Sequence, residues 1–311
     1  MIYSEKQLDS FSNPPFKYET QQVIKTKDLI QEALKKNIPN VTIQEKFQLD
    51  SFKYDIYLKG SYKNSTNITK SSDVDIVIEL TSVFYPDTSL LVEAQKAKYE
   101  AQKSTTLYKY AEFKNDIQAA LVKSFGNTII KRGNKSLKFI ENGTYCNADV
   151  IPCYTHKKFT FFESYSNSRL TEGIEFYSDA GEKIINYPHQ HYDNLVKKSE
   201  ETSGNYKATV RMFKNLRDKL IENKIIGDGV AKSYYIENLL YNVDSKLFSG
   251  DYSDRFKKVL GQLVTDFNNN SIDNYKCANG IHKLIADNTW SKESARQFLT
   301  GLTKIRDQNE F

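Results

Sequence analysis

The chain has 311 residues, of which 39% are hydrophobic and 13% aromatic, so it can bury one large core or two ordinary ones. Its 44 basic and 39 acidic residues leave a net charge of +5, which suits a small anionic substrate and argues against a long nucleic-acid ligand. No stretch approaches the about 20 apolar residues that cross a bilayer, and the first residues lack the pattern of a secretory signal. We therefore expect a cytoplasmic protein with no membrane partner.

The three cysteines, Cys146, Cys153 and Cys277, are too few for a disulfide framework. The first two lie close in sequence to His156, but a zinc site uses four ligands at a standard spacing that this segment lacks. Free thiols on or beside a strand are therefore expected.

The N-terminal region is predicted to be a loose start of about fifteen residues followed by a helix. The helix is predicted over residues 16–37, because Val23, Ile30 and Leu34 fall on one helical face.

Strands follow, predicted from β-branched and aromatic residues bounded by turn residues. The first two cover 54–60, which ends at a Gly turn, and 72–80. A long helix of mixed charge is predicted over 88–124. Three short strands come after it, over 127–132, 136–141 and 144–154.

The residue pattern changes near residue 187. Beyond it, helical periodicity predicts helices over 206–224, 231–243 and 254–269. The predicted fold is α/β (α+β): a mixed sheet with helices packed on it, then a helical lobe, with the active site in the cleft between them. The sequence suggests a catalytic lobe over residues 1–185 and a helical lobe over 186–311.

Two carboxylates interrupt the apolar run of the second strand. Asp73 and Asp75 are separated by one residue, so both side chains point to the same face. The residues that alternate with them point to the other face, into a core: Val74, Ile76 and Ile78. Like charges side by side repel and raise each other's pKa, a conflict that a divalent cation resolves. Hard carboxylate oxygens favour Mg²⁺.

A third carboxylate, Asp149, lies in the strand-like run NADVIPCY. Three carboxylates on one sheet face can hold two Mg²⁺ ions, or Mn²⁺ in their place: one activates an attacking hydroxyl and the other carries the triphosphate and leaving pyrophosphate. Gly60 and Ser61 form a turn before the strand, where a backbone without a Cβ and a hydroxyl can cradle a phosphate. The combination predicts nucleotidyl transfer.

Each part of this pattern also has an ordinary structural explanation. An isolated Asp-Val-Asp is typical of a strand edge or a surface turn, and a lone Gly-Ser is typical of any turn. Competing phosphate motifs are missing from the sequence: SGNYKAT (203–209) lacks the second Gly-Lys of a Walker A loop, and there is no Gly-x-Gly-x-x-Gly. The order and strand contexts of the three aspartates favour the catalytic interpretation.

Together these motifs resemble the polymerase-β-like nucleotidyltransferases. They are Gly60-Ser61, Ser72-Asp73-Val74-Asp75-Ile76 and Asp149-Val150-Ile151-Pro152. The closer likeness is to the bacterial branch related to cGAS and DncV, the CD-NTases, and runs from about residue 45 to 302. Residues 186–220, 232–243 and 288–302 look like that family's lobe-joining segment, Ser-Tyr helix and C-terminal helix.

The resemblance implies roles for particular residues of the catalytic lobe. Asp73, Asp75 and Asp149 match the acidic residues that hold two Mg²⁺ ions, and Gly60 and Ser61 match the Gly-Ser turn.

In the helical lobe, the resemblance implies that Lys214 and Ser233 reach the donor triphosphate and that Tyr234 stacks on a base. Lys207 is a weaker phosphate candidate. The alternatives are that Lys214 is a solvated helix residue and that Tyr234 belongs to the core.

The implied activity joins two or more NTPs (ATP, UTP or GTP) into a cyclic oligonucleotide with release of pyrophosphate. In the family, that product activates a separately encoded effector in antiphage defence (CBASS). The zinc-binding insertion of the animal members and the basic face of the oligoadenylate synthetases have no counterpart in this sequence. Transfer of one nucleotide to an RNA, protein or small-molecule acceptor, and a catalytically silent interaction module, stay open as alternatives.

The choice of base centres on Asn186, which ends the strand-like EKIIN before Tyr187-Pro188. IINYP followed by a Ser-Tyr helix looks most like the CdnE clade, some of whose members use an Asn near this point to read uracil. An amide can donate to a uracil carbonyl and accept from its N–H. The alternative is that Asn186 only shapes a turn before proline.

Overall fold

The computed structural model describes residues 3–15, 17–68, 73–143, 145–285 and 291–308. The chain divides into two compact units, one formed by Met1–Phe16, Gly60–Ser71 and His189–Phe311 and the other by Lys17–Lys59 and Ser72–Pro188. We call them the helical unit and the sheet unit. The division into a catalytic lobe and a helical lobe between residues 185 and 186 stays a prediction. The compact units differ from it in grouping the N-terminal segment and the Gly-Ser segment with the helical residues.

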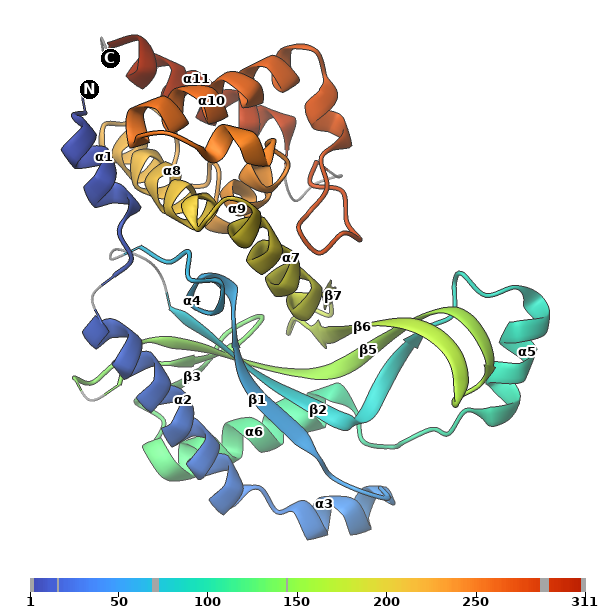
Figure 1. The fold of residues 1–311 in the computed structure, drawn as a ribbon. Helices are drawn as coiled ribbons and strands as arrows, with labels where there is room; N and C mark the ends of the chain where they lie inside the picture. The colour runs from blue at the N-terminus through green and yellow to red at the C-terminus, as the bar shows by residue number, and fades with distance from the viewer. Residues whose placement is uncertain (1–2, 16, 69–72, 144, 286–290, 309–311) are drawn as a thin grey trace. The chain divides into compact units, whose positions relative to one another are not determined.

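The sheet unit is built on one mixed sheet, as the sequence predicted (Figure 1). Its strands are β1 (Tyr54–Lys59), β2 (Val74–Asp87), β3 (Ile130–Arg132), β4 (Leu137–Phe139), β5 (Ala148–Ser164), β6 (Asn167–Tyr177) and β7 (Lys183–Asn186). They follow the order β1-β2-β5-β4-β3, with β6 paired to β5 and β7. Among the strand pairs of the described residues, only β2 and β5 run parallel. A parallel pair needs a long crossover, and this one contains α5 (Glu93–Gln102) and α6 (Tyr110–Phe125).

Both faces of this sheet bury apolar side chains: Val77, Ile151 and Cys153 lie in a cluster on one face, and a core covers the other. Ile76 pairs with Val150 across β2 and β5, and both side chains are fully buried. Further along β5 on the same face, Tyr154 contacts Phe113 of α6, with ring centroids 5.7 Å apart. Side chains alternate along a strand, so the residues between these positions point to the opposite face. That opposite face is the one on which Asp75 lies.

The structure confirms the predicted strands and helices of the sheet unit, but their end points differ from the predicted ones. Strand β2 runs on to Asp87 after a register shift between Leu80 and Phe84, and β6 was not predicted at all. The extended parts of the strands bury a small core of their own with α5: Leu91, Tyr99, Phe159 and Phe162.

The predicted helix over 88–124 is two helices, because residues 103–109 interrupt it. The interruption contains Ser104, Thr105 and Thr106, whose short polar side chains compete with helical hydrogen bonding. The Thr106 hydroxyl accepts a hydrogen bond from the Tyr108 amide at 3.1 Å. The other helices of this unit are α2 (Lys17–Asn37), which confirms the prediction over 16–37, and α3 (Asn40–Phe47).

The expectation of a loose N-terminus is wrong, because residues Glu5–Ser12 form helix α1. A capping box starts it: the Gln7 amide donates to the Ser4 hydroxyl at 3.4 Å, and the Ser4 amide donates to the Gln7 side chain at 2.9 Å. Ser-x-x-Gln is a recognised helix-start signal, so the sequence contained this information. Leu8 then anchors the helix in the core of the helical unit.

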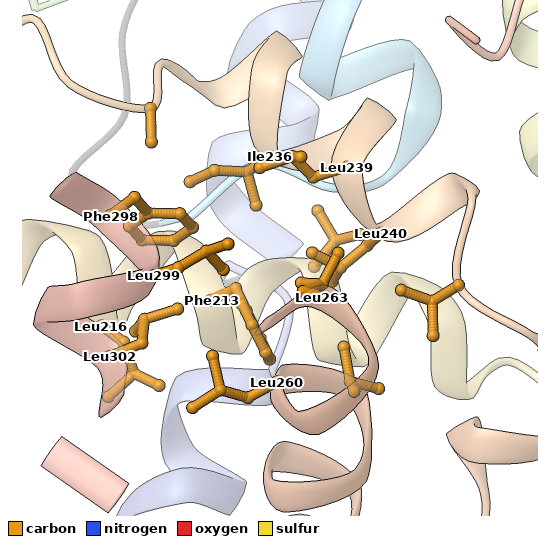
Figure 2. Packing of buried hydrophobic residues seen from close by; sticks show 14 of the residues in the cluster. Phe213, Leu216, Ile236, Leu239, Leu240, Leu260, Leu263, Phe298, Leu299 and Leu302 are labelled. Carbon is orange, nitrogen blue, oxygen red and sulfur yellow. The ribbon is translucent and has the colours of Figure 1, made fainter. Parts of the chain in front are cut away.

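The helical unit confirms the predicted C-terminal helices. The predictions over 206–224, 231–243 and 254–269 correspond to α8 (Asn205–Glu222), α9 (Ser233–Tyr241) and α10 (Tyr252–Asn268). The unit also contains α4 (Gly60–Asn64), α7 (Pro188–Glu201) and α11 (Lys292–Gln308), with 3-10 turns at Ser245–Phe248 and Ser271–Asn274. Figure 2 shows Phe213 of α8 among leucines of α9, α10 and α11. None of the helices in the described part of the chain is long and apolar enough to span a bilayer.

Candidate active site

The sheet register brings two of the three predicted aspartates together. Asp75 on β2 is paired with Asp149 on β5 in the parallel ladder, and Lys59 on β1 is paired with Asp75 from the other side. Asp73 lies immediately before β2 begins. Ser72, which belongs to the same sequence motif, lies outside the described residues.

Two residues that the sequence analysis missed contact these carboxylates. The Lys138 ammonium donates to Asp73 Oδ2 at 2.9 Å and to Asp149 Oδ1 at 2.7 Å. The Ser136 hydroxyl donates to Asp149 Oδ1 at 2.6 Å. Lys138 is held on β4, where it is paired with Asp149 in the ladder. Its position between two buried residues of a short strand was the available signal, because alternation places it on the polar face.

Electrostatics at Asp75 favour a bound cation. Burial raises the pKa of Asp75 above its ordinary value; the Lys59 ammonium opposes this, and the Asp149 and Asp73 carboxylates add to it. A carboxyl group in this position is therefore costly to ionise unless positive charge is brought close to it.

The donor set fits Mg²⁺ in its chemistry, because all three groups are carboxylates, the hard oxygen ligands that this ion prefers. The Lys138 ammonium, bridging Asp73 and Asp149, already shows that this edge of the sheet binds positive charge. Among the described residues, however, no three His, Cys, Asp or Glu side chains converge closely enough to hold one ion. Ligation by all three aspartates thus requires their side chains to turn toward a common point.

The Gly-Ser motif takes a different local form from the predicted turn. Gly60 directly follows β1 and starts the five-residue helix α4. Its φ of +67° lies in the left-handed region, which a residue without a Cβ adopts at low cost. The Ser61 hydroxyl has no hydrogen-bond partner among the described residues, whereas the Ser61 carbonyl accepts from the Thr66 amide at 2.9 Å.

Lys214 is buried inside the helical unit. It is 1% exposed, and its ammonium donates to Glu237 Oε1 at 2.7 Å and to the Thr66 carbonyl at 2.9 Å. The alternative that Lys214 is a solvated helix residue is wrong for that reason. Lys207, about two turns earlier on α8, is half-buried. Burial is the main cause that lowers its pKa, and the nearby Arg211 charge lowers it further.

Ser233 and Tyr234 open helix α9, and both are half-buried. The Tyr234 ring stacks on the imidazole of His191, with centroids 5.1 Å apart and planes 21° apart. Burial is the main reason why the pKa of Tyr234 is raised. The ring therefore already lies in a stacked arrangement within the helical unit.

Asn186 is the last residue of β7, where it is paired with Ile174 of β6. A Cβ at the neighbouring Gly173 would lie 2.6 Å from the Asn186 carbonyl, so glycine permits the close approach of the two strands here. The Asn186 side chain is half-buried and has no hydrogen-bond partner among the described residues. Its amide is therefore available to a ligand.

The cysteines behave as predicted. All three are free thiols, and Cys153 is fully buried. His156 donates from Nδ1 to Glu175 Oε2 at 2.8 Å rather than joining the cysteines. Within the described part of the chain no zinc-like cluster forms.

The mixed sheet with two aspartates on neighbouring strands, together with a separate helical unit, fits the nucleotidyltransferase architecture that the sequence motifs indicated. Comparison with known proteins agrees. A family model described as the cGAS/DncV-like nucleotidyltransferase C-terminal helical domain matches residues 193–306.

Relatives cover most of the chain. The cyclic nucleotide synthase CdnE01 of Staphylococcus haemolyticus is 37% identical over 310 residues, which is 98% of this chain and 99% of the relative. The cyclic dipurine nucleotide synthase of Elizabethkingia meningoseptica is 36% identical and covers 87% of each chain. The solved structure of the Rhodothermus marinus CdnE c-UMP-AMP synthase with Apcpp and Upnpp has a TM-score of 0.82 at 34% identity, over 99% of this chain and 98% of that one. This chain belongs to the cGAS/DncV-like nucleotidyltransferases.

Proposed function

We propose that the protein is an Mg²⁺-dependent synthase that joins NTPs into a cyclic dinucleotide or a larger cyclic oligonucleotide and releases pyrophosphate. The observation that carries this proposal is the pairing of Asp75 with Asp149 in the β2–β5 ladder, with Asp73 adjacent, in a chain of this family. The relatives are named as cyclic nucleotide synthases, which supports a cyclic product here.

Asp73, Asp75 and Asp149 are the residues that would hold Mg²⁺, or Mn²⁺ in its place. When bound, the ions supply charge neutralisation at the triphosphate and activation of the attacking hydroxyl. The protein's own contribution is to hold the three carboxylates on rigid strands, since precise placement of reacting groups lowers the barrier to phosphoryl transfer. Lys138 keeps Asp73 and Asp149 oriented toward each other.

Substrate binding is assigned to both the backbone and side chains. We assign phosphate contacts to Gly60, whose missing Cβ allows close approach, and to the hydroxyls of Ser61 and Ser233. Tyr234 offers an aromatic ring for stacking on a base. Lys214 supports this arrangement from within the protein, because its ammonium is occupied by Glu237 and Thr66.

The relatives differ in the bases they use, since one is named for two purines and another for UMP and AMP. We propose uridine in the product of this chain, read by the Asn186 side-chain amide, which has unfilled donor and acceptor positions among the described residues. A separately encoded effector activated by the product, in antiphage defence of the CBASS type, is proposed from the family resemblance.

The test is incubation of the purified protein with each radiolabelled NTP, singly and in mixtures, with Mg²⁺ or Mn²⁺, followed by phosphatase treatment and chromatography. A phosphatase-resistant product is expected, and its label identifies the bases. Asp73→Ala with Asp75→Ala should abolish it, while Asp55→Ala, an exposed change on β1, should not. If the double variant formed product at the rate of the parent, the proposed active site would be refuted.

A further inference from the structure

A single buried carboxylate connects four parts of the helical unit. Glu237, on α9, is 2% exposed. It accepts hydrogen bonds from the Lys214 ammonium at 2.7 Å, the Thr66 hydroxyl at 2.5 Å, the Asn64 amide at 3.2 Å and His191 Nε2 at 3.3 Å. These donors come from α8, from the segment that ends α4, and from α7. We call this group the Glu237 cluster.

The first consequence concerns the Gly-Ser segment. Asn64 and Thr66 lie just after Gly60 and Ser61, and both are buried. The same segment is tied down a second time, because Arg211 donates to the Ser65 carbonyl at 2.6 Å. The conformation of the phosphate-binding segment therefore depends on the orientation of the Glu237 carboxylate.

The second consequence concerns the stacking residue. His191 contacts Glu237 through Nε2 and stacks its ring on Tyr234. Its other ring nitrogen, Nδ1, is buried and has no hydrogen-bond partner among the described residues. A buried nitrogen without a partner costs free energy, so this imidazole is held where it is by its two contacts rather than by a fully satisfied site.

Stability alone does not account for a buried ion pair of this kind. Replacing such a pair by apolar side chains is often neutral or stabilising, whereas a satisfied polar network fixes one orientation of its members. The Glu237 cluster fixes the orientation of two things at once: the segment carrying Gly60 and Ser61, and the ring of Tyr234.

We propose that Glu237 and His191 are positioning residues that couple the phosphate-binding segment to the base-stacking ring of the nucleotide subsite. Glu237 holds the segment of residues 60–66, and His191 transmits the orientation of Glu237 to Tyr234. Occupation of the phosphate contacts therefore favours the stacked position of the ring, and the reverse also holds. This inference rests on the proposed function, since it assigns that nucleotide to this subsite.

Two variants separate the two links made by His191. His191→Phe keeps an aromatic ring against Tyr234 but loses the hydrogen bond to Glu237. His191→Gln keeps a donor that can reach Glu237 but loses the stacked ring. The matched control is His189→Gln, an exposed histidine on the same helix.

The measurement is calorimetric binding of two probes in Mg²⁺: a non-hydrolysable ATP analogue, and inorganic triphosphate, which has no base to stack. His191→Phe should weaken both probes, each by about tenfold, because the phosphate-binding segment is released. His191→Gln should weaken the ATP analogue by a similar factor and leave triphosphate binding unchanged. The His189 variant should bind both probes like the parent.

Thermal unfolding of each variant is recorded alongside, to separate positioning from folding. Parent-like binding of both probes by both variants would overturn the proposal. So would an equal loss on both probes in both variants that follows a loss of thermal stability, because that pattern belongs to a purely structural histidine. A parent protein that binds neither probe would instead refute the proposed nucleotide function, and the inference with it.

Discussion

Asp75 is the residue at which stability and the proposed chemistry conflict most directly. Burial raises its pKa, and the neighbouring Asp149 and Asp73 carboxylates raise it further against the opposing Lys59 ammonium. The folded state therefore holds the proton of this group more tightly than the unfolded state, whose value is near 3.8. Ionising Asp75 at neutral pH consequently destabilises the fold.

Asp75→Asn should raise the thermal stability of the metal-free protein at pH 7 while reducing product formation below detection. The gain in stability should be absent well below pH 3.8, grow as the pH rises through the raised pKa, and then level off, because only the parent carries the cost of ionisation. Thermal unfolding at several pH values, with EDTA present, checks this. Asp55→Asn, an exposed carboxylate on β1, is the matched control and should change neither quantity. A variant less stable than the parent at pH 7 would contradict the argument.

Asn186 is the residue at which base choice is proposed to be decided. Asn186→Ser removes the paired donor and acceptor, so incorporation of uridine should fall about tenfold or more relative to purines. The relative rates with UTP, ATP and GTP in competition measure this. An unchanged base preference would leave Asn186 with only the role of ending β7 before Pro188.

At the scale of elements, helix α9 provides a buried negative charge that balances a buried positive charge of the helical unit. Burial by itself would raise the pKa of Glu237, but the Lys214 ammonium and the hydrogen bond from His191 hold it well below its ordinary value. Lys214 is buried as well, and desolvation lowers its pKa against the pull of Glu237. Each charge is therefore tolerated only because the other is present.

Glu237→Gln should destabilise the protein by about 3–5 kcal/mol, because it leaves the Lys214 ammonium buried without a counter-charge. The parent's advantage should be complete above pH 4.5, the ordinary value for Glu, and should diminish as the pH falls below it, since Glu237 then begins to be protonated on unfolding. Urea unfolding at pH 7 and at lower pH tests both statements. Glu200→Gln, an exposed change on α7, should have little effect, and an equally small effect at Glu237 would refute the account.

At the scale of the whole molecule, the hydrophobic cores follow the two compact units. The residues of the large cluster that includes Phe213 belong to the helical unit, with contributions from α1 as well as α8 to α11. Figure 2 shows members from α8 to α11. The sheet unit has separate clusters around Val77 and Phe159. A defect in one core should therefore be felt first within its own unit.

Phe213→Ala should cost about 3–5 kcal/mol in the stability of the helical unit, because it opens a cavity between α8 and α10. Hydrogen exchange followed by mass spectrometry should show lost protection in α1 and α8 to α11, and smaller changes in β2 and β5. Leu107→Ala, at a residue 68% exposed, is the control and should leave exchange unchanged. Equal loss in both units would mean that the chain unfolds as one cooperative block.

Strong periodic patterns were sufficient to predict several elements from the sequence. The alternation of Val74, Ile76 and Ile78 predicted β2, and the helical spacing of Val23, Ile30 and Leu34 predicted α2. Short or mixed segments were not predictable in this way. Strand β6 pairs β5 and β7 along most of its length but begins with polar residues, so only its pairing reveals it as a strand.

The candidate site likewise combines features that were predictable from the sequence with features that were not. Alternation along one strand predicted that Asp73 and Asp75 share a face, which is a property of local geometry alone. The partnership of Asp75 with Asp149 required the parallel register of β2 and β5, and the contacts of Lys138 required the neighbouring antiparallel strand. Pairing between distant strands depends on the whole sheet, so no local pattern encodes it.

Local sequence patterns were enough to indicate the class of chemistry, because three carboxylates and a Gly-Ser motif in strand contexts are recognisable without coordinates. They also determined most helices, through periodic burial. Which charged groups are buried and paired inside the protein depends on tertiary packing. The family resemblance implies a phosphate contact for Lys214, and packing of α8 against α9 buries its ammonium beside Glu237, because a buried charge is costly unless it is paired.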